Sequence, residues 1–382
     1  MKRKNKISSL FAFMIAIVAI LAVVGACSTA SAETLVVDPE GKGDYTGIQE
    51  AVNAANPRDT ILVNPGTYEV NLKVDRELKI WSDSRKPGDT IIRAADLAEN
   101  AVEIGADRVT FSGFGIEGSE KAGVYLKGAD NCYINNNEIS GSEYGIHLEN
   151  SSRNVMSNNV LSLNEIGIRL EASGKNTIQT NVIAYNYGYG VSLAESTGNQ
   201  IYDNYFKNVE NVEENAENQE NFWSIALTTK KNIVGGPYIA GNFWADLEDT
   251  GYSETCTDEN SNGLCDSPYE VKGGGNDQSP LYPKVPAAIT ALESRLDPTA
   301  YEEGLASRGE EELDTETPEE GGVEEGTTEE EAEEAETETE PEGEEEEATE
   351  EEAAGETNGA PGPGLGIAVL AAGAAYLLRK KK

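Results

Sequence analysis

The sequence predicts an all-β fold, a right-handed single-stranded parallel β-helix with coils of about 22 residues. The first observation is a repeat whose apolar strands begin at almost constant spacing, at Ala101, Gly123, Gly145, Gly167 and Gly190. A period of this size indicates stacked units of a few strands each. The second observation is that apolar residues alternate within each strand, as a half-buried strand requires.

A second strand in each repeat carries an asparagine at a fixed position. Its apolar residues are Ile134, Met156, Ile178 and Ile201, and the asparagines follow at Asn137, Asn159, Asn181 and Asn204. Equivalent positions of stacked coils lie about 4.8 Å apart, so we expect these amides to bond one above another as a ladder. The usual handedness of parallel crossovers predicts a right-handed coil.

The remaining elements are less regular. Earlier strands are expected at residues 61–63, 72–74, 78–80 and 91–92, and a later one at 225–227. Residues 208–221 are polar and acidic, which predicts a loop projecting from the stack. Residues 45–55 predict an amphipathic helix, with capping-box spacing from Thr46 to Gln49. This helix would cover the open N-terminal end of the sheets.

Composition divides the chain into six segments. We expect a signal peptide at 1–32, the β-helix at 33–247, a C-terminal cap at 248–285, a linker at 286–308, a disordered acidic stalk at 309–360 and a C-terminal transmembrane or sorting signal at 361–382. A basic start, an apolar stretch and a small-residue cleavage site at 30–32 support the signal peptide. Cys27 leaves lipoprotein processing open as an alternative.

The C-terminal segments predict a surface attachment to the membrane. Residues 309–360 contain 26 acidic residues and no Lys or Arg, so they cannot form a core. An apolar stretch of 14 residues follows at 365–378, which makes a helix of about 21 Å, shorter than the hydrocarbon core. The basic residues 379–382 indicate its cytoplasmic side.

This tail resembles the C-terminal sorting signals of archaeal surface proteins, the PGF-CTERM class. The resemblance implies cleavage by an archaeosortase and replacement of the helix by a lipid. Here the motif reads Pro361-Gly362-Pro363-Gly364-Leu365 and lacks the Phe. A plain membrane anchor therefore remains the alternative.

Net charge restricts the partners. Of the formal charge of −40, the stalk carries −26 and the two basic ends carry +8, which leaves −22 on residues 33–308. Such a body repels nucleic acid and anionic lipid, and it disfavours long acidic polysaccharides unless cations bridge the two. We expect a monomer that binds no nucleic acid.

A loop near the end of the predicted fold has the pattern of a calcium site. Its oxygen ligands would be Asp258, Asn260, Asn262, the carbonyl of Leu264, and Asp266. Alternating oxygens with Gly263 at the sharp turn suit a hard cation. The alternative is a polar turn that needs no metal. Cys256 and Cys265 bracket this loop, and a secreted chain favours their pairing as a disulfide, whereas Cys132 is expected to be a buried thiol.

The outward face of the repeat strands holds the candidate reactive groups. Alternation places Glu103, Tyr125, His147, Arg169 and Ser192 in one row and Lys127, Glu149 and Glu171 in the next. His147, Glu149, Arg169 and Glu171 are weak candidates for an acid/base site acting on an acidic sugar. The alternative is a solvated face of mixed charge. Tyr125, His147 and Arg169, with Tyr185, Tyr187 and Tyr189 at one corner, are candidate sugar-binding residues, although such tyrosines also stack on neighbouring coils.

The stretches 43–52, 59–68, 241–246 and 262–269 resemble the NosD-like family of parallel β-helix proteins. The family's named member assists copper delivery to nitrous oxide reductase. Copper prefers Met, Cys and His ligands, and here Met156 is a core position and His147 is the one histidine. We therefore expect no copper.

These observations predict a secreted protein attached to the outer face of the cell membrane. We expect a non-catalytic envelope, adhesion or glycan-binding module. The alternative is an extracellular polysaccharide lyase or epimerase that uses the row of His147.

Overall fold

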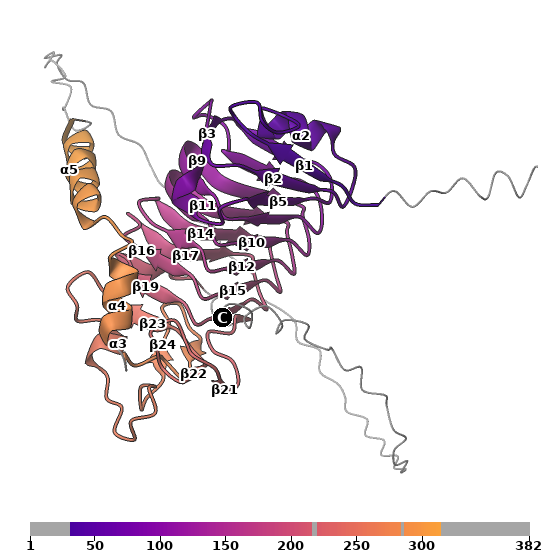
Figure 1. Ribbon diagram of the computed structural model, residues 1–382. Coiled ribbons are helices and arrows are strands. Elements are labelled where there is room, and N and C mark those ends of the chain that lie inside the picture. The colour runs from indigo at the N-terminus through magenta and orange to yellow at the C-terminus, as the bar shows by residue number, and fades with distance from the viewer. Residues whose placement is uncertain (1–30, 216–219, 284–285, 315–382) are drawn as a thin grey trace, which may run out of the picture. The chain divides into compact units, whose positions relative to one another are not determined.

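The computed structural model describes residues 31–215, 220–283 and 286–314 (Figure 1). The predicted signal peptide up to residue 30, the stalk beyond residue 314 and the C-terminal segment lie outside these ranges. The described chain winds into a parallel β-helix, in which each strand pairs with the equivalent strand of the next coil, as Ile134 pairs with Met156 and Met156 with Ile178. The predicted fold class and repeat are therefore confirmed.

One face of the solenoid is an eight-stranded parallel sheet that takes one short strand from each coil. Its strands are, in order, β1 (Thr34–Val37), β2 (Thr60–Val63), β5 (Lys79–Ser82), β8 (Thr110–Ser112), β10 (Tyr133–Asn135), β12 (Val155–Ser157), β15 (Thr177–Gln179) and β18 (Gln200–Tyr202). The middle residue of the later strands points inward, and Ile134, Met156 and Ile178 are fully buried.

The other two faces belong to one 13-stranded sheet. One face contains β3 (Gly66–Glu69), β6 (Thr90–Arg93), β13 (Val160–Leu161), β16 (Val182–Ala184), β19 (Tyr205–Lys207) and β23 (Phe243–Ala245). The other contains β4 (Leu72–Val74), β7 (Val102–Ile104), β14 (Ile166–Glu171), β17 (Tyr189–Ala194) and β20 (Glu210–Val212). The long strands β9 (Gly115–Lys127) and β11 (Glu138–Glu149) pass through both faces and join them.

The predicted asparagine ladder forms the corner between two faces. Asn137, Asn159, Asn181 and Asn204 are fully buried. The side-chain oxygen of Asn159 accepts from the backbone N–H of Asn137 (3.0 Å) and from its side-chain amide (3.2 Å). The ladder continues to Asn242. Two further ladders, which the sequence analysis missed, stack Asn154, Asn176, Asn199 and Asn221, and Asn164, Asn186 and Asn208.

The N-terminal end is covered by α2 (Ile48–Ala54), as predicted (Figure 1). Ile48, Ala51 and Val52 are buried against the first coil. The predicted capping box is wrong, because Gly47 is the N-cap and no side chain caps the helix. Gln49 instead exchanges two hydrogen bonds with the backbone of Lys73 (2.7 and 3.1 Å), which fastens α2 to β4.

The insertion at 208–221 differs from the predicted projecting loop. β20 (Glu210–Val212) lies within it and pairs in parallel with β17, so these residues continue the stack, and residues 216–219 lie outside the described ranges. Val212 points into the core and is 4% exposed. The strand expected at 225–227 is absent from the described residues: Leu227 is 56% exposed, and the chain enters an antiparallel pair of β21 (Thr228–Thr229) and β22 (Tyr238–Ile239).

Short elements close the C-terminal end of the coil. They are α3 (Tyr252–Thr255), β24 (Tyr269–Glu270) and β25 (Asn276–Asp277). Two helices follow where a linker was expected, α4 (Pro286–Glu293) and α5 (Pro298–Asp314), and α5 lies beside the turns of earlier coils. One 3-10 turn, η1 (Pro87–Asp89), occurs earlier in the chain. The buried amine of Lys207 binds the carboxylate of Glu293 (3.0 Å) and fastens α4 to β19. None of the helices in the described ranges is long and apolar enough to cross a membrane.

Candidate functional site

The strand register brings the predicted outward row together. Tyr125, His147, Arg169 and Ser192 occupy paired positions on β9, β11, β14 and β17. Lys127, Glu149 and Glu171 form the neighbouring row. Strands in a sheet are about 4.8 Å apart, so each side chain in these rows can reach the one on the next coil.

His147 lies partly beneath two tyrosine rings. Its ring centroid is 5.1 Å from that of Tyr125 and 4.9 Å from that of Tyr144, and its side chain is 15% exposed. Burial lowers the pKa of His147, although the nearby Glu171 carboxylate opposes this. Its Nε2 atom is 3.6 Å from Glu171 and has no hydrogen-bond partner among the described residues.

The other polar groups of the row bind one another. The Tyr125 hydroxyl donates to Glu149, and burial together with this carboxylate raises the pKa of Tyr125. Arg169 donates to Ser192 (2.6 Å) and to Glu213 (3.3 Å), and the Ser192 hydroxyl also donates to Glu213. The cation that would bind an acidic sugar is therefore already paired.

Two members of this cluster were not predicted from the sequence. Tyr144 lies on the same strand as His147 and covers its ring. Its position three residues before His147 could have been used to predict this contact. Glu213 follows β20, inside the segment predicted to be a loop, and no sequence pattern placed it beside Arg169.

The three corner tyrosines do not form one exposed cluster. The rings of Tyr185 and Tyr187 lie 5.4 and 5.3 Å from that of Tyr301, which belongs to α5 and is 4% exposed. Burial raises the pKa of Tyr185. Tyr189 begins β17. The rings of Tyr185 and Tyr187 thus pack against α5. Neither of the two predicted partners, a sugar ring or a neighbouring coil, occupies this position.

A groove of about 770 Å³ lies beside these tyrosines, between α5 and the stacked turns that join the two faces of the 13-stranded sheet. Carboxylates from three successive coils line it, at Glu120, Glu143 and Glu165. Gly304 of α5 closes it, and a Cβ atom at that position would lie 2.0 Å from the Tyr187 hydroxyl. The groove is therefore acidic, and the sequence analysis did not predict it.

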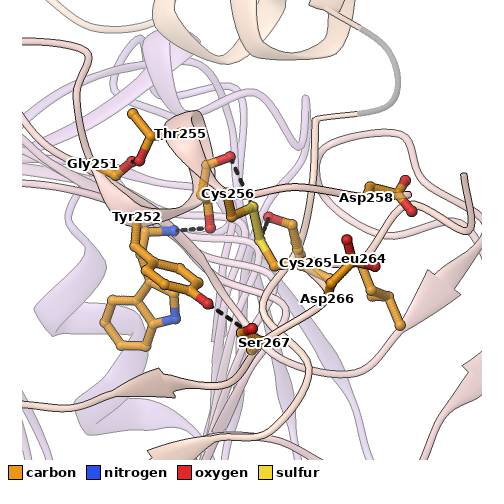
Figure 2. The surroundings of a disulfide bond; sticks show 12 residues. Gly251, Tyr252, Thr255, Cys256, Asp258, Leu264, Cys265, Asp266 and Ser267 are labelled. Atoms are coloured by element: carbon orange, nitrogen blue, oxygen red, sulfur yellow. Dashed lines mark hydrogen bonds between the residues drawn. A yellow bond between two sulfur atoms is a disulfide. The ribbon is translucent and has the colours of Figure 1, made fainter. Parts of the chain in front are cut away.

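Cys256 and Cys265 form the predicted disulfide, with Cα atoms 5.7 Å apart. Figure 2 shows it beside Tyr252, whose hydroxyl donates to the Ser267 carbonyl (2.7 Å). Cys132 is a buried free thiol, as expected, and burial raises its pKa to about 11. The bond closes the loop that carries the predicted calcium ligands.

The oxygens of this loop accept hydrogen bonds from its own backbone. Asp258 accepts from the amides of Asn262 (2.9 Å) and Gly263 (2.8 Å), and Asp266 accepts from that of Glu259 (2.9 Å). Gly263 has a positive φ, which fits the sharp turn. No cluster of three or more His, Cys, Asp or Glu side chains suited to a metal occurs in the described part of the chain. These bonds fit the polar-turn alternative, and calcium remains a prediction.

If the loop binds calcium, millimolar calcium chloride raises the melting temperature of the full-length protein, because a ligand of the folded state stabilises it. The double variant Asp258→Asn, Asp266→Asn should lose this rise. Magnesium chloride at the same concentration controls for ionic strength. Equal melting curves with and without calcium would contradict a calcium site.

Comparison with known proteins finds a family model that matches part of the chain. Residues 92–249 match the model of a family described as periplasmic copper-binding protein (NosD). An alginate lyase from Paenibacillus sp. str. FPU-7 is similar, with 16% identity over 46% of this chain and 66% of that chain, just under two thirds, at a TM-score of 0.40. Pectin methylesterase PemA from Erwinia chrysanthemi is similar at 13% identity, 54% and 74% coverage and a TM-score of 0.36. Similarity this low carries no argument about function. No curated protein matches the sequence.

Proposed function

Because residues 92–249 form a NosD-like parallel β-helix, we propose that the protein is an exported β-helix module attached to the cell surface, and that it binds envelope glycans without catalysing a reaction. The observation that supports the absence of catalysis is the pairing within the His147 row. Arg169 is bound to Glu213, and Tyr125 is bound to Glu149. A catalytic acid or base must reach the proton that it transfers. Here Arg169 and Tyr125 bind carboxylates of the protein itself and not a substrate.

The described residues do not fit a copper site. Copper prefers several soft ligands close together. Met156 and Cys132 are both fully buried in the apolar core, and His147 points outward on another face. A copper-binding role is therefore not part of the proposal, although the family is described by one.

A location outside the cytoplasm is supported by two observations. The Cys256–Cys265 disulfide belongs in an oxidising compartment, and the matched family is described as periplasmic. The predicted signal peptide and C-terminal anchor complete the proposal, and both lie outside the described residues.

Deleting residues 361–382 is expected to release the protein into the medium, because those residues carry the proposed attachment. Fractionation of cells and medium measures the release, and mass spectrometry of the native C-terminus separates the two forms of attachment. A lipid in place of the basic tail indicates sortase-type processing, and an intact Lys382 indicates a plain anchor. A deletion variant that stays on the cell would instead point to a lipid at Cys27.

A glycan-binding and turnover assay tests the function itself. We expect the full-length protein, kept soluble in a mild detergent, to bind glycans from a mixed array and to leave oligosaccharides unshortened. Absence of binding to every neutral and acidic glycan on the array would contradict the proposal.

One observation favours the alternative of a lyase or epimerase. The Nε2 atom of His147 lies near Glu171 and has no hydrogen-bond partner in the described part of the chain; it is buried, and it would be a possible general base once exposed to a substrate. Formation of unsaturated or epimerised products by the wild type, and their loss in His147→Ala, would establish the enzyme in place of the binding module.

A further inference from the structure

The eight-stranded sheet presents an outward surface almost without charge, which we call the neutral face. It consists of the outward positions on each strand: Thr34 and Val36, Thr60 and Leu62, Lys79 and Trp81, Thr110, Tyr133 and Asn135, Val155 and Ser157, Thr177 and Gln179, and Gln200 and Tyr202. Ser112, the other alternate position of β8, is 2% exposed and adds no surface. Lys79 is the one charged residue among these positions.

The orientation of these side chains follows from burial. On each strand from β5 to β18 the residue between the two outward positions is fully buried, as at Ile80, Ile134 and Ile201. Side chains alternate along a strand, so the flanking residues point away from the core. Tyr133 is 51% exposed, which makes it the most accessible aromatic ring of the neutral face.

The lack of charge contrasts with the body as a whole, since residues 33–308 carry −22. The two outward rows on the other sheet include charged residues, Arg169 in one row and Glu149 and Glu171 in the next. At the edge of the neutral face some charges are paired, since Glu77 binds Arg108 (2.9 Å) and Asp130 binds Arg153, whereas Asp83 and Lys175 are exposed. The neutral face is therefore a distinct surface and not an average sample of this acidic protein.

The chemistry of the neutral face is that of hydroxyl, amide and aromatic groups. The side chains of Thr110, Ser157, Thr177 and Gln200 make no side-chain hydrogen bond to another residue within the described ranges, although each can donate and accept. Aromatic rings stand among the other side chains. Tyr133 lies between Thr110 and Val155 in its row. Trp81 lies nearer the N-terminal end, with the Arg85 guanidinium 4.3 Å from its ring centroid.

We propose that the neutral face binds a neutral polysaccharide, with the extended chain running along the stack. This rests on the proposed glycan-binding function and names its surface and ligand class. A neutral glycan offers many hydroxyl groups and apolar ring faces, which match hydroxyl and amide side chains and aromatic rings. The strand spacing of about 4.8 Å repeats these groups at close to the length of one sugar residue.

Charge favours a neutral polysaccharide over the two other candidate ligands of this face, a second copy of the chain and an acidic polysaccharide. A second copy of this chain and an acidic polysaccharide would both bring negative charge against a body of −22. A neutral polymer brings none, and it meets no unpaired acid on the neutral face.

Affinity electrophoresis of the full-length protein in a mild detergent tests the proposal. The gels contain dextran, galactomannan or mixed-linkage β-glucan as neutral probes, and polygalacturonate or alginate as acidic probes. We expect retardation by at least one neutral probe and by neither acidic probe. Tyr133→Ala and Thr177→Glu should each weaken it about tenfold, since loss of one stacking ring or entry of one charge costs on the order of 1.4 kcal/mol.

Glu69→Gln is the matched control, because it changes an exposed outward side chain of β3, on another face, and should bind as the wild type does. Melting curves confirm that each variant folds. If the wild type binds neutral glycans and both neutral-face variants bind equally well, the inference is wrong and the proposed function stands. Retardation by the acidic probes alone also overturns the inference. Binding to no glycan of either class overturns the proposed function and the inference together.

Discussion

Asn159→Leu is expected to lower the free energy of unfolding by about 3 kcal/mol, since each buried group that loses its partner costs about 1–3 kcal/mol. The oxygen of Asn159 accepts from two donors of Asn137, and its amide donates to Ile134 and Asn181. Leucine can make none of these bonds, and the Asn137 backbone N–H would stay buried without an acceptor. Denaturant unfolding of the full-length protein measures the loss.

The neighbouring residue provides the control for this substitution. Asn158 is exposed at the same corner and has a positive φ, which glycine adopts freely. Asn158→Gly should therefore change the free energy of unfolding by less than about 0.5 kcal/mol. If Asn159→Leu unfolded at the same denaturant concentration as the wild type, the ladder would not be a source of stability.

Gly241→Ala is expected to cost about 3 kcal/mol, at the upper end of overpacking effects in cores. A Cβ atom at this position would lie 1.9 Å from the Asp277 carboxylate. That carboxylate is fully buried and accepts from the backbone of Asn242 (2.7 Å), the Trp244 indole (2.9 Å) and the backbone of Ser279 (3.0 Å). It cannot move aside without breaking these bonds.

Gly105→Ala makes the same substitution where the added Cβ atom meets nothing within 4 Å. Its melting temperature should equal that of the wild type within error, whereas Gly241→Ala should melt lower. Two variants that melt together would mean that the C-terminal cap adjusts freely around Asp277.

The coil itself was predictable because its signal is repeated along the chain. A single apolar strand is ambiguous, but the recurrence of Ile134, Met156 and Ile178 with Asn137, Asn159 and Asn181 can hardly arise by chance, and all of them lie where predicted. The disulfide was predictable for a different reason, since Cys256 and Cys265 are close in sequence and bracket one loop.

Contacts without a repeat were not predictable. Tyr301 reaches Tyr187 from a helix far along the chain, and Glu213 reaches Arg169 from a segment whose polar composition indicated a loop. Thr46 and Gln49 have the spacing of a capping box. The prediction was wrong because the Gln49 side chain bonds instead to the backbone of Lys73 in the adjacent coil. In each case a tertiary contact outweighed the local pattern.

The hydrogen bonds of the central ladder give the stack an electrical direction. Each asparagine donates to the oxygen of the next coil, from Asn137 to Asn159 and onward to Asn204 and Asn242. Aligned bonds of this kind reinforce one another and leave the last donor at a positive end. That donor is the backbone N–H of Asn242, and it meets the Asp277 carboxylate, whose pKa burial raises to about 7 against the pull of these donors. The stack thus ends at an acidic side chain, much as many helices begin at one. Another coil cannot extend the ladder there, because the Asn242 backbone N–H already donates to Asp277.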